Sequence, residues 1–401
     1  MERDCVIAGG GPAGMVLGFV LARAGLNVTV LEKHADFLRD FRGDTIHPST
    51  LTLLGELGLR ERFLALPVTR IESLDVVFDG TRMTLVDFSS LPAPDNLLVL
   101  APQWDFLDFL AGEGRTLPGF DLRMRTAATG LVEEDGRVVG VRASGPDGEE
   151  ELRATLTVAA DGRHSTLRDA MGATPIEHGV PIDLLWFRLP KGEVRTPPTL
   201  AYLSAHGMVL TIDRGDYYQS GLIIPKGSFD ALRAQGLDAF RARVAKAVPH
   251  LAGPVESIRD WEQVSLLSVQ VNRLATWHRP GVVAIGDAAH AMSPMFGVGV
   301  NFAIQDAVAL ANAVTPFLRA GVAPDEVLAA FQARREVPVR KMQRMQTFGH
   351  RLIMRPGAKR FAPGWVLAVM ERLAPRIRKV AARRIGIGFL PEHPQYAGGH
   401  G

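Results

Sequence analysis

The sequence predicts an α/β protein, in which a discontinuous Rossmann-like nucleotide-binding domain carries an inserted β-sheet domain and ends in C-terminal helices. Three observations predict this class. A glycine-rich turn separates an apolar run at 5–8 from a helical pattern at 15–24. A strand rich in β-branched residues follows at 28–31 and completes a βαβ unit. A second apolar strand, at 282–285, leads through another glycine-rich loop into a helical pattern at about 299–316.

Composition and charge are those of an ordinary globular protein. The 401 residues are 47% hydrophobic and 22% charged, which allows a sizeable core. Lys and Arg number 45 against 43 Asp and Glu, and a net charge of +2 argues against a nucleic-acid-binding protein. The lone cysteine, Cys5, excludes a disulfide framework and a cysteine-rich zinc site, and we expect no metal. Neither a secretory signal nor an apolar run of about 18–20 residues stands out, so we expect a cytoplasmic location.

Two strand-rich insertions interrupt the α/β framework. The first contains Asp79-Gly80, a strong hairpin signal, and the second contains apolar runs at 184–189, 208–212 and 217–224. The expected division is a discontinuous nucleotide-binding domain at 1–70, 101–174 and 269–345, a β-rich substrate domain at 71–100 and 175–268, and a C-terminal helical region and tail at 346–401.

The first motif is the run GGGPAG at 9–14, which matches G-x-G-x-x-G. Gly9 permits a tight turn, Gly11 lets the backbone approach a pyrophosphate, and Gly14 lets helix and strand pack closely. Glu32 ends the next strand, where a carboxylate accepts hydrogen bonds from ribose hydroxyls. The context favours a dinucleotide over a ligand-free turn, but this motif alone does not identify which dinucleotide.

The second motif is GDAAHAMSPMFGVGVN at 286–301. Its apolar strand delivers Asp287 at the carboxyl end, where open α/β sheets bind ligands. The following helix N-terminus can stabilise negative charge. A third motif, AADGRHS at 159–165, ends a strand in Asp161-Gly162, with Ser165 as a candidate helix N-cap. The simpler interpretation of this third segment is a capped turn.

Together, these motifs resemble the FAD-dependent aromatic monooxygenases of the p-hydroxybenzoate hydroxylase-like group. The second motif is similar to the family's second FAD fingerprint, and the Asp-Gly segment is similar to one that serves both FAD and NAD(P)H. The resemblance covers residues 1 to about 345 in order. It implies a bound FAD, NADPH or NADH as a transient electron donor, and O₂ as the second substrate.

The resemblance also implies a set of cofactor-binding residues. Arg42 is similar to the family arginine near the flavin phosphate and sugar, and Gln103 lies where many relatives have arginine. The full set is Gly9, Gly11, Pro12, Ala13, Gly14, Glu32, Lys33, Arg42, Gln103, Asp161, Asp287, Pro294, Gly297, Val298, Gly299 and Asn301.

The family mechanism implied by the resemblance needs no catalytic triad or metal. NAD(P)H reduces FAD, O₂ adds to give a flavin C4a-hydroperoxide, and one oxygen atom passes to an aromatic or polycyclic small molecule. The protein positions the cofactor and keeps the pocket dry. No residue is therefore identified as catalytic from the sequence.

Candidate substrate-binding residues each have a simpler alternative. Met295 and Phe296 lie in the second motif, in the loop that approaches the flavin ring in the family. His47, before a helical pattern, could line the flavin face or only bond to backbone. His290 is expected to be a structural hydrogen-bonding residue.

In the inserted sheet, the period of two places Leu185, Phe187 and Leu189 on one face, and Trp186 and Arg188 on the other. Arg188 could bind an acidic substrate, but the simpler prediction turns the aliphatic face inward and leaves Arg188 in solvent. Tyr217 and Gln219 are weaker candidates on a shared face.

Several alternatives stay open at this point. The fold also supports FAD-dependent dehydrogenases, reductases and halogenases. A halogenase-type W-x-W-x-I-P run is absent from the sequence. A basic stretch at 355–384 either contacts a membrane weakly, as in a redox flavoprotein without turnover, or packs on the FAD domain. The substrate, the choice of NADH or NADPH, the type of oxygen insertion and the oligomeric state are not specified by the sequence.

Overall fold

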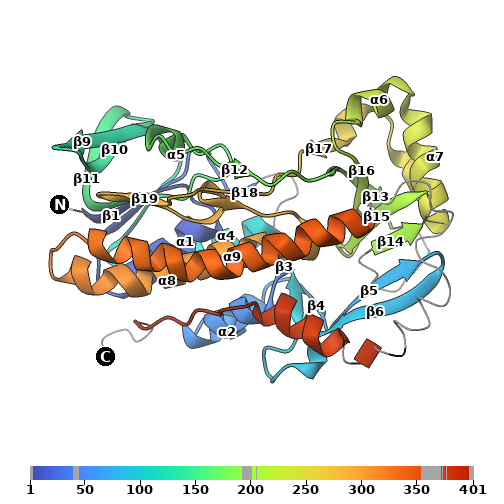
Figure 1. Cartoon of the computed structure of the whole chain (residues 1–401), viewed down its shortest axis with the longest axis horizontal. Helices are drawn as coiled ribbons and strands as arrows, with labels where there is room; N and C mark the ends of the chain where they lie inside the picture. The colour runs from blue at the N-terminus through green and yellow to red at the C-terminus, as the bar shows by residue number, and fades with distance from the viewer. Residues whose placement is uncertain are drawn as a thin grey trace.

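The computed structural model describes residues 3–38, 45–191, 201–204, 206–353, 372, 374–375 and 377–396. Figure 1 shows an elongated molecule with a large sheet at each end and two long helices beneath and between them. Arg42 and four basic residues of the C-terminal stretch (Arg355, Lys359, Arg360 and Arg376) lie outside the described residues, as does the tail at 397–401.

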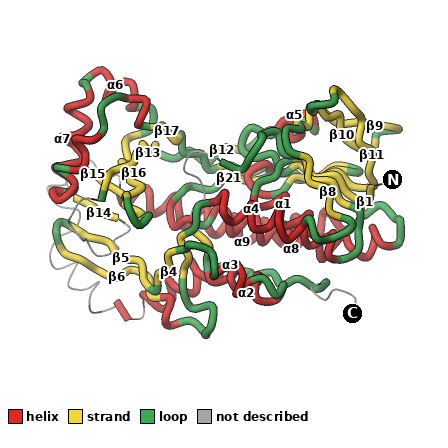
Figure 2. Tube along the Cα trace, turned by 180° about the vertical axis from the view of Figure 1, so that it is seen from behind, coloured by secondary structure: helices red, strands yellow, loops and turns green. Residues whose placement is uncertain are grey.

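An eight-stranded sheet forms the end that holds the N-terminus (Figure 2). Its main path runs β19-β20-β11-β1-β2-β8, and β10 and β9 extend from β11 as an antiparallel hairpin. The parallel pairs β1–β2 and β1–β11 put the carboxyl ends of these strands at one edge. The strands are β1 (Arg3–Ala8), β2 (Val28–Leu31), β8 (Phe120–Arg123), β9 (Ala127–Glu134), β10 (Arg137–Gly145), β11 (Gly148–Ala159), β19 (His278–Arg279) and β20 (Val282–Ala284).

Helix α1 (Pro12–Arg23) joins β1 to β2 and completes the βαβ unit that the sequence predicts. The side chains from Ala13 to Ala22 are all buried, because α1 packs against α8 (Gly299–Arg319) and α4 (Gln103–Gly114). Gly25 ends α1 with a φ of +84°, as expected of a C-terminal glycine. Helix α8 is buried over most of its length and forms the centre of the core.

A seven-stranded sheet, called the cap sheet below, forms the other end, with the order β17-β13-β16-β15-β14-β5-β6. Its strands fall within the two insertions expected from the sequence, although the domain boundaries themselves remain a prediction. The hairpin at Asp79-Gly80 is confirmed, with φ angles of +45° and +88° at the turn. The strands are β5 (Ser73–Phe78), β6 (Thr81–Asp87), β13 (Ile182–Pro190), β14 (Ala201–Ser204), β15 (Gly207–Asp213), β16 (Tyr217–Pro225) and β17 (Ser265–Leu267).

The two faces of the cap sheet are covered differently. Leu185, Phe187 and Leu189 pack in one cluster with residues of α6 (Phe229–Ala234) and α7 (Leu237–Ala247). The aliphatic face of β13 is thus buried under its own helices. The opposite face, which carries Trp186, is turned toward the rest of the molecule and lines a cavity.

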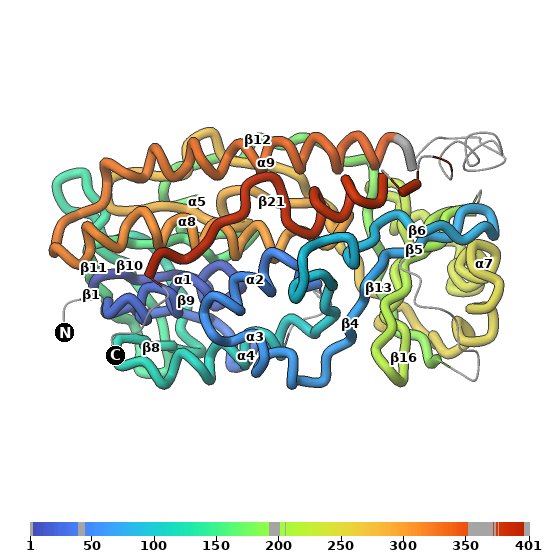
Figure 3. The backbone as a smooth tube through the Cα atoms, turned by 90° about the horizontal axis from the view of Figure 1, so that it is seen from below, coloured from blue at the N-terminus to red at the C-terminus, as the bar shows by residue number. Residues whose placement is uncertain are grey.

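The remaining elements join the two ends. Helix α9 (Asp325–Ile353) runs along the molecule, and the C-terminal segment returns between α9 and α2 (Pro48–Glu56), as Figure 3 shows. A π-helical turn at Ala382–Ile387 contacts α2. The other elements are α3 (Arg60–Leu64), α5 (Thr166–Ala170), and two small sheets made of β3 (Thr45–Ile46), β4 (Thr69–Ile71) and β7 (Leu98–Leu100), and of β12 (Ile176–Glu177), β18 (Asn272–Arg273) and β21 (His290–Ala291).

The described part of the basic C-terminal stretch packs on the protein. Arg378 Nε donates to the carbonyl of Thr84 at 2.8 Å, and Ala382 is fully buried. Farther on, the amide of Gln395 donates to Asn312 Oδ1 at 2.9 Å. The described part of this stretch therefore contacts the cap sheet through Arg378 and the FAD-binding half through the turn at Ala382–Ile387, and weak membrane contact by the stretch stays a prediction.

Candidate functional site

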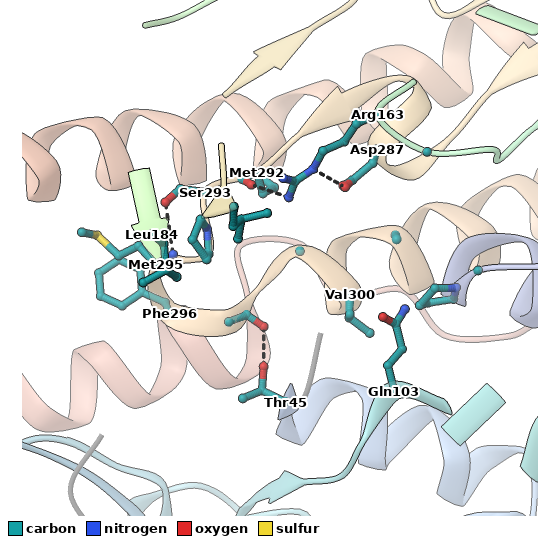
Figure 4. Close-up of a pocket in the computed structure, with 18 of the residues that line it drawn as sticks. Thr45, Gln103, Arg163, Leu184, Asp287, Met292, Ser293, Met295, Phe296 and Val300 are labelled. Carbon is teal, nitrogen blue, oxygen red and sulfur yellow. Dashed lines mark hydrogen bonds and ion pairs between the residues drawn. The ribbon is translucent and has the colours of Figure 1, made fainter. Parts of the chain in front are cut away.

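A cavity of about 1530 Å³ extends from the glycine-rich turn after β1 to the cap sheet (Figure 4). A pocket for one small molecule usually has a volume of about 300–1,000 Å³. The cavity therefore has room for a dinucleotide and a second ligand together. Polar and glycine residues line the half near β1, and apolar side chains line the half under the cap sheet.

Two glycines of the first motif, Gly11 and Gly14, have different surroundings. A Cβ atom on Gly14 would lie 1.9 Å from the carbonyl oxygen of Gly9, so the packing of α1 against the turn requires glycine there. A Cβ atom on Gly11 would have no described atom within 4 Å, and Gly11 lines the cavity. The backbone at Gly11 is thus exposed to a ligand at the start of α1, which no described side chain caps.

Glu32 lies at the carboxyl end of β2, beside this turn. Its Oε2 accepts a hydrogen bond from the amide of Gly10 at 3.1 Å, and its Oε1 accepts one from His34 at 3.0 Å. The carboxylate therefore holds the turn and also contributes to the cavity wall, together with Lys33 and Gln103.

Asp161 and Asp287 occupy the carboxyl ends of two neighbouring strands. Asp161 accepts hydrogen bonds from the hydroxyl of Ser165 and from the amide of Leu167, and burial raises its pKa. Ser165 also accepts from the amide of Arg168 at 2.9 Å, which confirms it as the N-cap of α5.

Arg163 joins the two Asp-containing motifs. Its Nε lies 3.0 Å from Asp287 Oδ2, and its Nη2 donates to the carbonyl of Met292 at 3.5 Å (Figure 4). Arg163, Asp287 and Met292 all line the cavity. The ion pair places a guanidinium and a carboxylate on the wall where a polar part of a dinucleotide would lie.

The loop of the second motif is fixed by Thr45 and Asn301. Thr45 Oγ1 donates to the carbonyl of Gly297 at 2.7 Å. Asn301 Nδ2 donates to the carbonyl of Thr45 at 3.1 Å, and its Oδ1 accepts from the amide of His47 at 3.0 Å. Asn301 is buried and acts as a bridge between the two loops, whereas Pro294, Gly297 and Gly299 line the cavity. Val298 is buried behind them at the start of α8.

Two residues of α9 hold the same loop from the other side. Gln346 Nε2 donates to the carbonyls of Ser293 and Met295 at 3.0 and 2.9 Å. His350 Nε2 lies 2.9 Å from Ser293 Oγ, and burial lowers the pKa of His350 to about 4. Sequence reasoning missed both residues, because nothing in a helical pattern beyond residue 345 relates it to a loop more than fifty residues earlier.

The candidate substrate residues separate into two groups. Met295 and Phe296 line the cavity, and Phe296 has a left-handed φ of +69°. His47 is fully buried away from the lining, where its Nδ1 contacts the carbonyl of Ile385 at 2.8 Å and burial lowers its pKa to about 4.

The cap-sheet candidates also lie outside the described lining of the cavity. Arg188 is exposed and stacks 5.2 Å from the ring of Tyr217, and the amide of Gln219 donates to the carbonyl of Phe187. The simpler prediction is confirmed, since the aliphatic face of β13 is buried and Arg188 is exposed, and Trp186 on the other face lines the cavity. The period of two identifies both faces of β13, but it does not say that α6 and α7 cover the aliphatic one.

The residues present fit a bound FAD. Open backbone at Gly11 offers an approach for a pyrophosphate, and α1 and α8 both begin at the cavity without a described side-chain cap. Helix N-termini favour negative charge, such as that of phosphate groups or of a reduced flavin ring. Glu32 and Asp287 supply carboxylates at strand ends for sugar hydroxyls.

Comparisons with known proteins agree with this geometry. Residues 2–346 match a family model described as FAD binding domain. The 6-methylpretetramide 4-monooxygenase of Streptomyces rimosus is 32% identical over 398 residues, which cover 96% of this chain and 93% of the relative. The anhydrotetracycline monooxygenase of the same species is 30% identical over 346 residues, covering 84% of this chain and 67% of the relative.

Solved structures show the same fold. The anhydrotetracycline hydroxylase OxyS from Streptomyces rimosus superposes with a TM-score of 0.77 at 26% identity, covering 96% of this chain and 76% of the other. CabE, an aromatic hydroxylase from angucycline biosynthesis, superposes with a TM-score of 0.73 at 23% identity over 96% of this chain and 76% of the other, and at that identity shows the fold alone.

Proposed function

This chain belongs to the FAD-dependent aromatic monooxygenases of the p-hydroxybenzoate hydroxylase-like group, and from that premise we propose that it oxidises a polycyclic aromatic small molecule. When bound, FAD takes electrons from NAD(P)H and activates O₂, so that one oxygen atom can be inserted into the substrate. The residues of the chain bind and orient the two ligands and exclude water.

The apolar half of the cavity is the observation that carries the proposal. The part of its wall contributed by the cap sheet contains no charged side chain among the described residues. A carboxylate buried against this wall would find no opposite charge on the cap sheet, which is unfavourable. The cap-sheet residues that form this wall are Leu74, Val76, Phe78, Leu85, Val86, Ile182, Leu184, Trp186, Ala201, Leu203, Met208, Leu210, Ile212, Ile223 and Leu267.

The extent of this wall favours several fused rings over one ring. It draws side chains from all seven strands of the cap sheet, and Met295 and Phe296 continue it toward the start of α8. A flat, mostly apolar ligand in contact with such a surface gains free energy in proportion to the area removed from water. The names of the relatives, which refer to 6-methylpretetramide and anhydrotetracycline, support a substrate of that size.

The cavity wall also supports exclusion of water from the reacting centre. Val380, Ala381, Arg384 and Ile385 of the C-terminal segment also line the cavity, so this segment helps to enclose the ligand. The start of α8 faces the same space, and its free N–H groups can stabilise negative charge on the ring of a reduced cofactor.

A panel of substrates tests the proposal. Purified FAD-loaded protein is mixed in air with NADH or NADPH, and oxygen uptake and hydrogen peroxide are measured with single-ring phenols and with three- and four-ring phenols. We expect the polycyclic compounds to stimulate oxygen uptake with little peroxide. Stimulation by single-ring phenols alone would contradict the proposed substrate class.

Membrane association is a separate matter. Among the described residues, the segment Met295–Arg319 has the length and hydropathy of a membrane span, but 78% of its most apolar window is buried inside the fold. This segment is the loop and core helix α8 described above. We propose a cytoplasmic location for the protein. The electron donor is a separate question, for which NADH and NADPH remain the two alternatives.

A further inference from the structure

Helix α9 contains a glycine, Gly349, where the helical backbone does not require one. Gly349 lies inside the helix, near its described end at Ile353. Glycine is a poorer helix former than alanine, because it loses more conformational freedom when it is ordered. Gly349 also lines the cavity. A contact made at this position, and not the helix itself, therefore accounts for the glycine.

Met295 occupies the space that a side chain at position 349 would fill. A Cβ atom on Gly349 would lie 2.8 Å from Met295 Sδ and 3.3 Å from Met295 Cε. Non-bonded carbon atoms are in favourable contact at about 3.5–4.0 Å, so both distances are too short for an added methyl group. The thioether of Met295 therefore rests on the backbone of α9, which is possible because position 349 has no side chain.

The backbones on both sides of this contact are held in place. The amide of Met295 donates to Ser293 Oγ at 3.1 Å, and its carbonyl accepts from Gln346 Nε2 at 2.9 Å. Gln346 belongs to α9 and also accepts a hydrogen bond from the amide of Ser293 at 3.2 Å. The loop and the helix are thus tied to each other one turn before Gly349. A methyl group at position 349 would be accommodated by movement of the Met295 side chain.

The cavity is the open space beside that side chain. Met295 and Gly349 line it together with Leu184 of the cap sheet. Figure 4 shows Met295 well separated from Asp287 and Gln103, which border the cofactor half. Methionine is flexible, whereas the surrounding interior is closely packed, so a displaced thioether would turn into the cavity. The space for an apolar ligand would become shorter.

We propose that Gly349 and Met295 together determine how long a fused-ring system the cavity accepts, and that Gly349 keeps the Met295 thioether out of the space for the last ring. The inference rests on the proposed function and deepens it, because it assigns the size limit of the polycyclic substrate to one pair of residues. Met295 forms the wall, and Gly349 acts through Met295 as a positioning residue.

The test is a double-mutant cycle measured by ligand binding. Full-length, FAD-loaded protein without an electron donor is dialysed to equilibrium against two probes. Quinizarin has three fused rings, and dihydroxynaphthacenequinone extends it by one more fused ring. The variants are Gly349→Ala, Met295→Ala and the protein that carries both substitutions.

The two probes should respond differently to Gly349→Ala. We expect the four-ring probe to bind about tenfold more weakly, as for an extra methyl group forced into a packed site, and the three-ring probe to lose less than about twofold. The shorter ligand can move along the cavity away from the displaced thioether. When Met295→Ala is also present, Gly349→Ala should affect neither probe, because the side chain that it displaces is gone.

Gly112→Ala is the matched control. It also replaces a helical glycine, in α4, but a Cβ atom there would have no described atom within 4 Å. Both probes should bind this variant as they bind the unmodified protein. FAD content and the midpoint of urea unfolding are recorded for every variant and should stay close to the unmodified values, which separates a change in the cavity from a loss of folding.

Four results would overturn the inference: no binding of either probe by the unmodified protein, no loss in Gly349→Ala, an equal loss for both probes, or a loss for the four-ring probe that persists when Met295→Ala is present. Oxygen uptake with NADH and NADPH is measured separately with three- and four-ring phenols. If the cycle gives the expected result but no polycyclic phenol stimulates oxygen uptake, the proposed function is contradicted and the inference about the two residues stands.

Discussion

His290 Nε2 lies 2.6 Å from Asp306 Oδ2, and this buried contact ties the second FAD motif to the helix that follows it. The same oxygen accepts a hydrogen bond from the amide of Gly286 at 3.1 Å, and Asp306 Oδ1 accepts from Arg335 Nε at 2.8 Å. Burial alone would raise the pKa of Asp306, but His290 and Arg335 lower it. The carboxylate therefore holds together the end of β20, α8 and α9.

Replacing Asp306 should destabilise the whole FAD-binding half. Asp306→Asn removes the closer of the two carboxylates that pair with the buried guanidinium of Arg335 and leaves only the 3.4 Å contact with Glu392, and breaking a buried pair costs about 3–5 kcal/mol. The measurement is the free energy of unfolding in urea. Asp169→Asn is the matched control, because Asp169 is exposed and pairs, within the described part of the chain, with its neighbour Arg168 alone, so its change should stay within about 0.5 kcal/mol. Equal losses in the two variants would contradict this account of the network.

Substitutions of Gly11 and Gly14 in the first motif should affect different properties, FAD binding in one case and stability in the other. A side chain on Gly11 would project into the open cavity, so Gly11→Val should weaken FAD binding at least about tenfold and leave the stability of the FAD-free protein almost unchanged. Gly14→Ala would drive a methyl group into the carbonyl of Gly9 and should cost about 1–3 kcal/mol even without FAD. FAD titration and urea unfolding of the FAD-free proteins separate the two effects. A loss of FAD-free stability in Gly11→Val would argue against the ligand-facing role of Gly11.

Acid should destabilise the protein through two buried histidines. Burial lowers the pKa of His47 and of His350 from 6.5 to about 4. Between those values the unfolded chain binds more protons than the folded one, so stability is lost as pH falls from about 6.5 to about 4. The full loss is about 3 kcal/mol for each histidine, at about 1.4 kcal/mol per pKa unit.

His47→Asn tests this pH dependence, because asparagine keeps a donor near the Nδ1 position and cannot titrate. Urea unfolding at pH 8 measures what the variant loses in packing. The further decline between pH 6.5 and pH 4.5 should be smaller in the variant than in the unmodified protein, and smaller again when His350→Asn is added. Parallel declines in all three proteins would show that these two histidines do not cause the acid sensitivity.

Gln346 should control how well oxygen consumption is coupled to product. Gln346→Leu removes the hydrogen bonds to the carbonyls of Ser293 and Met295 and leaves those groups buried without a partner. The loop beside the substrate would loosen and admit water, so the ratio of hydrogen peroxide to consumed oxygen should rise several-fold.

Thr347→Ala is the matched control for this prediction. Among the described residues, the hydroxyl of Thr347 bonds to the carbonyl of Gln343 in its own helix and not to the loop. The ratio of peroxide to oxygen should therefore stay at the value of the unmodified protein. A rise of the same size in Thr347→Ala, or no rise in Gln346→Leu, would contradict the role given to Gln346.

The sequence allowed the local parts of the fold to be predicted, because each depends on neighbouring residues. The glycine turn, the hairpin at Asp79-Gly80 and the N-cap at Ser165 each follow from backbone preferences within a few positions. Asp287 lies in the turn that follows β20, as expected from an apolar run at 282–285 that stops at Gly286.

The contacts that complete the site could not be predicted in the same way. His350 meets Ser293 across 57 positions, and Arg335 meets Asp306 across 29. Such pairs depend on how α9 packs, and helical periodicity does not specify that packing. Likewise, Trp186 was assigned to the correct face of its strand, but only the positions of α6 and α7 show that this face is the one lining the cavity.

The most direct test of the central claim is the origin of the oxygen atom in the product. The FAD-loaded protein is supplied with NADH or NADPH, a polycyclic phenol that stimulates oxygen uptake, and ¹⁸O₂ in unlabelled water, and the product is analysed by mass spectrometry. We predict that the product contains a single ¹⁸O atom. A product whose new oxygen comes from water, or a dehydrogenated product without new oxygen, would contradict the assignment of this chain as a monooxygenase.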